Sequence, residues 1–126
     1  IISLCLIAVV CFACFAPALA LQDNRITPCA IVTFSSGMPK VAGTTNKYNP
    51  YAIASVGLPE QLSVGFTLYK VVNGNEIYIT SDSDGGYGNY FEAEAVVTLS
   101  KGTYKLYAYY RGETKSDGSV TTYNSG

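Results

Sequence analysis

Residues 90–111 read YFEAEAVVTLSKGTYKLYAYYR, two alternating runs joined by a Lys-Gly turn. Successive side chains of a β-strand point to opposite faces, so a period of two predicts two adjacent strands, each with one buried face. In the second run, Leu106 and Ala108 suit a protein interior. We therefore expect Tyr107 and Tyr109 to face outward.

The rest of the chain beyond residue 20 shows similar short runs bounded by turn residues, without a sustained helical period. Predicted strands cover residues 29–34, 40–45, 51–56, 62–72, 76–80, 90–99, 104–111 and 120–123. The pair Asn73-Gly74 predicts a tight hairpin, because both residues tolerate positive φ. Residues 57–59 are expected to form a turn, and residues 81–88 a glycine-rich loop. Seven or eight strands at this spacing predict an all-β fold, a single antiparallel β-sandwich over residues 21–126.

Residues 99–108, LSKGTYKLYA, resemble the corner before the next-to-last strand of fibronectin type III and immunoglobulin-like domains. In those families a Leu, a turn Gly and a Tyr form a tyrosine corner. The resemblance implies an immunoglobulin-like sandwich in which the Tyr104 hydroxyl bonds back to the backbone of the corner. Residues 62–123 also resemble uncharacterised small secreted proteins of Gram-positive bacteria in the order of their strands, hairpin and glycine-serine loop, although a Trp expected near the hairpin is absent. Neither resemblance implies an activity.

Residues 1–20 carry no charge and are almost wholly apolar up to Ala16. Pro17 and the small residues of Ala18-Leu19-Ala20 follow, which is the order of a secretory signal peptide cleaved after Ala20. A membrane anchor is one alternative, but the apolar run is shorter than the roughly 20 residues a spanning helix needs. A lipoprotein anchor is another, and the residues before Cys11 and Cys14 fit it poorly. We expect a secreted protein that contacts membranes only through the uncleaved signal segment, and a sequence that is a fragment at both ends.

Cleavage would leave Cys29 as the single cysteine of the mature chain. A lone cysteine in an oxidising compartment is either buried and inert or available for a bridge between chains. Because Cys29 precedes the apolar residues 30–32, we expect it to be buried.

The sequence lacks the residues that several kinds of catalytic and metal-binding site require. The chain has no His, and a lone Cys forms neither a Cys-cluster zinc site nor a redox pair, so we expect no enzyme, catalytic residue, metal or cofactor. The segment Asp82-Ser83-Asp84-Gly85-Gly86 resembles the start of a calcium loop but lacks the third acid and the closing Glu. Glu92 and Glu94 share one strand face and cannot flank a glycosidic bond from both sides. The net charge is −1 without a basic run, so we expect no nucleic-acid partner.

Tyrosine is the unusual residue, with eleven in the chain and no Trp. Tyr69 and Tyr78 flank the predicted hairpin, and Tyr107 and Tyr109 project from their strand, so these four form a candidate binding surface. The simpler interpretation is that Tyr is a good strand former whose hydroxyl tolerates water. We expect a non-enzymatic binding module for a glycan or a protein, of undetermined oligomeric state. The alternatives are a secreted toxin or antimicrobial protein that acts on membranes and, third, a small secreted enzyme.

Export can be checked directly. We expect N-terminal sequencing of the extracellular protein to begin at Leu21, since cleavage follows the small residue Ala20. Recovery of the protein from the membrane fraction with residues 1–20 intact would instead favour the anchor.

Overall fold

The computed structural model describes residues 31–125, and within that range it contains strands and no helix. The strands are β1 (Val32–Gly37), β2 (Lys47–Tyr48), β3 (Tyr51–Val72), β4 (Asn75–Glu94), β5 (Val97–Thr98), β6 (Gly102–Arg111) and β7 (Ser116–Ser125). All pairings are antiparallel. The predicted signal segment 1–20 and the predicted burial of Cys29 lie outside the described residues.

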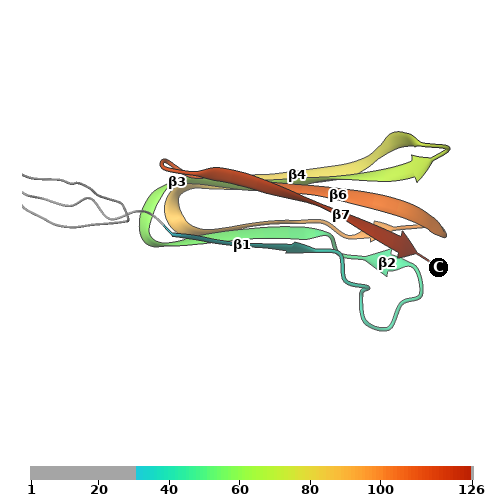
Figure 1. The fold of residues 1–126 in the computed structure, drawn as a ribbon. Coiled ribbons are helices and arrows are strands. Elements are labelled where there is room, and N and C mark those ends of the chain that lie inside the picture. Colours follow the sequence, from blue (N-terminus) through green and yellow to red (C-terminus); the bar gives the residue numbers. More distant parts are fainter. Residues whose placement is uncertain (1–30, 126) are drawn as a thin grey trace, which may run out of the picture. The chain divides into compact units, whose positions relative to one another are not determined.

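The centre of the fold is the hairpin of β3 and β4, which turns at Asn73-Gly74 as predicted. Both residues adopt positive φ, 53° at Asn73 and 79° at Gly74, which suits the tight turn of a twisted hairpin. The two strands pair from Val72 and Asn75 back to Tyr51 and Glu94, with an interruption between Ser55 and Glu60. Along the way both strands fold over, so that the hairpin supplies strands to two layers (Figure 1).

The bend of this hairpin corrects two expectations. Residues 57–59 do not separate two strands but lie inside β3, where the register shifts between Ser55 and Glu60. Residues 81–88 are not a loop but part of β4, paired with β3 throughout. Glycine permits this path because the strands come very close: a Cβ on Gly85 would lie 2.9 Å from the Leu62 carbonyl oxygen.

The smaller predicted strands also differ in extent. Residues 40–45 contribute only a bridge at Lys40, because the chain turns there, with Gly43 at φ 78° and the Thr44 amide donating to the Val41 carbonyl. The predicted strand 90–99 is divided between β4 and β5, and β5 pairs with β2 in a separate small sheet. The last strand, β7, is longer than predicted.

The main sheet is curled into two layers. The first layer consists of β1, residues 51–56 of β3 and residues 90–94 of β4. The second layer consists of residues 75–88 of β4, residues 60–72 of β3, then β6 and β7, in that order. The fold is therefore all-β and antiparallel, with a sandwich-like arrangement made by one curled sheet.

Bulky side chains of the second layer face small ones of the first. Tyr104, Leu106, Ala108 and Tyr110 on β6 are at most 3% exposed, which confirms the predicted phase of that strand. The alanines of the first layer are fully buried, namely Ala52, Ala54 and Ala93. Interdigitation of large and small residues fills a core without voids.

The hydrogen bond that the resemblance to a tyrosine corner predicts for Tyr104 is present. The Tyr104 hydroxyl donates to the Ser100 carbonyl oxygen over 2.7 Å, within the corner that precedes β6. Lys70 donates to the Ser100 hydroxyl over 2.8 Å, and its ammonium lies 5.9 Å from the centre of the Tyr104 ring. The corner thus ties the start of β6 to β3.

One edge of the first layer is capped by the second. Residues 90–94 of β4 form that edge, and the amides of Glu92 and Glu94 point away from β3. Asp84 accepts from the Glu92 amide over 3.2 Å, and Asp82 accepts from the Glu94 amide over 3.0 Å. These two aspartates, considered above for calcium, instead satisfy backbone donors that a neighbouring chain would otherwise pair with.

Removing the hydroxyl of Tyr104 tests the corner. We expect Tyr104→Phe to lower the free energy of unfolding by about 0.5–1.5 kcal/mol, because one hydrogen bond to a part-buried carbonyl is lost. Tyr109→Phe is the control, since the Tyr109 ring lies on the outer face. Equal urea midpoints for Tyr104→Phe and the parent would show that the corner bond contributes nothing.

Candidate binding surface

The four predicted tyrosines share one surface, the outer face of the second layer. Tyr69 comes from β3, Tyr78 from β4, and Tyr107 and Tyr109 from β6. Tyr69 pairs directly with Tyr78 across the hairpin, while β6 pairs with β3 on its other side. We call this set the tyrosine surface.

Three of its rings contact one another in edge-to-face geometry. Tyr69 lies at the centre, 6.3 Å from the Tyr78 ring at 79° and 5.5 Å from the Tyr107 ring at 85°. Such pairs contribute about 0.5–1.5 kcal/mol beyond the area they bury. The rings therefore hold one another in place without a ligand.

The outermost tyrosines remain open to solvent. Tyr78 is 57% exposed and Tyr109 is 43% exposed, whereas Tyr69 and Tyr107 are half-buried between them. The Tyr109 ring lies over Gly65, where a Cβ would come within 2.6 Å of the ring's Cζ. Glycine at this position lets the ring lie flat against the sheet.

Polar contacts hold two of the hydroxyl groups of the surface, those of Tyr107 and Tyr78. Tyr107 donates to Glu76 over 2.6 Å, and Lys105 lies 3.5 Å from the same carboxylate. The hydrogen bond to Glu76 raises the pKa of Tyr107, and desolvation and the negative charge of Glu76 raise it further. The Tyr78 hydroxyl lies 2.9 Å from that of Ser81.

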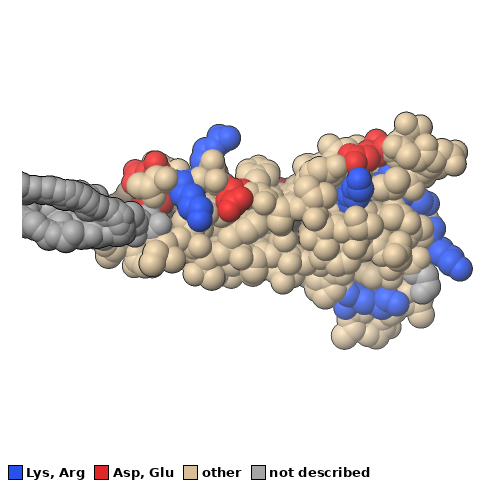
Figure 2. Space-filling model, viewed as in Figure 1, with Lys and Arg blue, Asp and Glu red and all other residues tan. Residues whose placement is uncertain are grey.

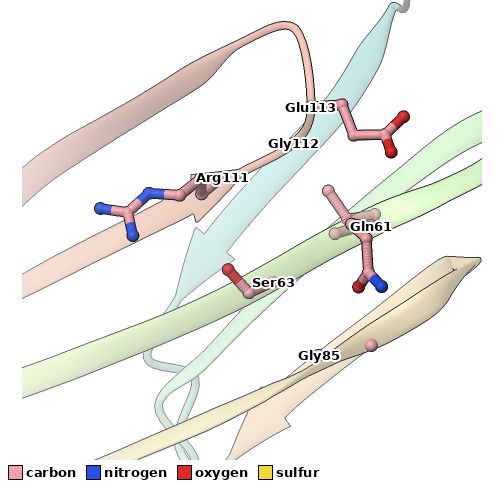
Figure 3. A pocket seen from close by; sticks show the side chains of 8 residues that line it. Gln61, Ser63, Gly85, Arg111, Gly112 and Glu113 are labelled. Carbon is pink, nitrogen blue, oxygen red and sulfur yellow. The ribbon is translucent and has the colours of Figure 1, made fainter.

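A shallow hollow of about 250 Å³ lies on the second layer near its bend. It is lined by Gln61, Leu62, Ser63, Gly85, Gly86, Arg111, Gly112 and Glu113. Figure 3 shows the Arg111 and Glu113 side chains pointing in different directions around Gln61 and Ser63. Arg111 follows Tyr109 by two residues on β6, about 7 Å along the strand, so the hollow adjoins the tyrosine surface.

The sequence did not reveal the hollow. Its lining includes glycines from residues 81–88, which were expected to form a loop between two hairpins. One signal was available: Arg111 has the same strand phase as Tyr107 and Tyr109, so it had to share their face.

The remaining carboxylates form no such surface. Glu94 accepts from the Asn49 amide over 3.3 Å, and Glu92 accepts from the Tyr90 hydroxyl over 3.2 Å. Across residues 31–125, no three His, Cys, Asp or Glu side chains are grouped so as to hold a metal ion. In the same range, no helix has the length and apolar character needed to cross a membrane.

Comparisons of the chain with models of known protein families and with curated protein sequences found no match.

The pKa of Tyr107 can be tested through its acceptor. We expect Glu76→Gln to lower the pKa of Tyr107 toward its ordinary value of 10.0, because the hydrogen bond to a carboxylate is lost and ionisation no longer places two negative charges together. NMR of protein labelled at the tyrosine Cζ follows each ring, and Tyr107→Phe assigns the signal. An unchanged titration in Glu76→Gln would contradict the observed hydrogen bond.

Proposed function

We propose that the chain is a secreted, non-enzymatic binding module with an immunoglobulin-like sandwich, and that its tyrosine surface binds a glycan. The observation that carries the proposal is the set of three interlocked tyrosine rings, Tyr69, Tyr78 and Tyr107. The exposed Tyr109 ring lies beside them against Gly65. Rings held in place before binding lose little conformational freedom when a ligand arrives. This favours recognition over a purely structural use of tyrosine.

A glycan fits the chemistry of this face better than a purely apolar partner does. Sugar rings present C–H faces that pack on aromatic rings, and hydroxyl groups that need hydrogen-bonding partners. The hollow beside Tyr109 provides such partners in Gln61, Ser63, Arg111 and Glu113. Aromatic packing with a few polar groups at one end is the usual composition of a small-molecule site.

The setting of the module is part of the same proposal. The uncharged residues 1–20 support secretion. The bond between Tyr104 and the Ser100 carbonyl supports the immunoglobulin-like relationship. The resemblance to small secreted proteins of Gram-positive bacteria rests on the sequence alone.

The test compares two exposed tyrosines on opposite faces. Tyr78 is 57% exposed on the tyrosine surface, and Tyr90 is 54% exposed on the outer face of the first layer. Among the described residues each hydroxyl has one side-chain partner, Ser81 for Tyr78 and Glu92 for Tyr90. Tyr90→Ala is therefore a matched control for Tyr78→Ala.

We expect Tyr78→Ala combined with Tyr109→Ala to weaken binding to a glycan array at least tenfold, because aromatic packing is lost at both positions. Tyr90→Ala should bind as the parent does, and circular dichroism should show all variants folded. Equal binding by the double variant and the parent would refute the tyrosine surface. Absence of any glycan bound by the parent would refute the ligand class.

A further inference from the structure

The edges of the second layer differ in how they are protected. The β4 edge carries Asp82 and Asp84, whose side chains point inward toward the first layer. Inward-pointing charges on an edge strand are a recognised obstacle to pairing with another chain. The opposite edge is β7, which within residues 31–125 pairs with β6 alone.

The β7 edge has few such obstacles. Its ten residues, SDGSVTTYNS, contain no Pro, and Asp117 is their only charge. The β-branched residues Val120, Thr121 and Thr122 favour extended pairing, and Val120 is 57% exposed. Figure 1 draws β1 and β7 toward the viewer, and Figure 2 shows from that side a middle region free of charged side chains.

The direction of the free backbone groups follows from the β6–β7 turn. The Gly112 amide donates to the Lys115 carbonyl over 2.6 Å, so these residues form a hydrogen-bonded pair. Such pairs alternate along an antiparallel ladder, and the β6–β7 register is continuous. Odd-numbered residues of β7 therefore bond to β6, and the amides and carbonyls of residues 116, 118, 120, 122 and 124 point away from the sheet.

We propose that β7 pairs antiparallel with β7 of a second copy of this chain, around a two-fold axis at Val120. The five outward-directed residues are symmetric about Val120, so overlap of the whole strand places that residue opposite itself. Asp117 then faces Tyr123 of the other copy, and like charges do not meet. Symmetric pairing of identical surfaces is the commonest form of protein dimer.

The pairing would join the two tyrosine surfaces, although it does not depend on glycan binding. Even-numbered residues of β7 lie opposite Tyr107, Tyr109 and the other outward residues of β6. In the dimer even-numbered residues face even-numbered residues, so the outer faces of both copies continue as one. The result is an eight-stranded sheet with a tyrosine surface on each half.

Proline substitutions distinguish the β7 residues whose amides point outward from those whose amides bond to β6. Thr122→Pro removes an outward amide and keeps the β6 ladder, so it should give a monomer with a melting temperature within a few degrees of the parent. Thr121→Pro is the control, because it removes an amide bonded to Leu106 and should lower stability. Val120→Lys, which places two ammonium groups opposite each other, should also give a monomer.

Sedimentation equilibrium of the purified chain measures mass, and hydrogen exchange locates the contact. We expect the parent to form dimers at high micromolar concentration, with the amides of Val120 and Thr122 protected only in the dimer. A parent that stays monomeric at millimolar concentration overturns the proposal. A dimer that persists in the folded Thr122→Pro and Val120→Lys variants also overturns it. So does protection of the β7 amides from exchange that appears only when peptides of another sequence are added.

Discussion

Pairing between β3 and β4 on both sides of their bend underlies the other features of the domain. Because both strands fold over and resume their pairing beyond the bend, one hairpin forms the middle of the second layer and a large part of the first. β1 and β6 then pair with the other side of β3, β1 along residues 51–56 and β6 along residues 63–71. The core, the capped edge and the tyrosine surface all take their positions from this bend.

The bend also brings together residues that no single strand could juxtapose. The carboxylates of Asp82 and Asp84 reach the backbone amides of Glu94 and Glu92 because β4 bends and contributes to both layers. The hollow forms where Gly85 and Gly86 leave the surface bare near the bend. The bend therefore helps to protect the β4 edge of the first layer, and its glycines help to form the hollow on the second layer.

Features that neighbouring residues determine could be predicted from the sequence. Features that depend on pairing between distant segments could not. The alternation of residues 104–111 gave the buried face of β6, and Asn73-Gly74 gave the hairpin that places Tyr69 beside Tyr78. The contact between Tyr69 and Tyr107 depends on β3 pairing with β6, which no nearby residues specify. Residues 57–59 and 81–88 were misassigned because glycine, proline and aspartate favour both turns and bent strands, and only distant pairing decides between them.

The length of the β3–β4 hairpin has a consequence for folding kinetics. Pairing that starts at Asn73-Gly74 closes only a small loop, and each further pair extends an existing ladder at little entropic cost. The bend must form before β1 finds its place, whereas β6 can add to the half of β3 nearest the turn. The second layer would then assemble early and the first late, which leaves β1 as the last strand to be protected from exchange with solvent.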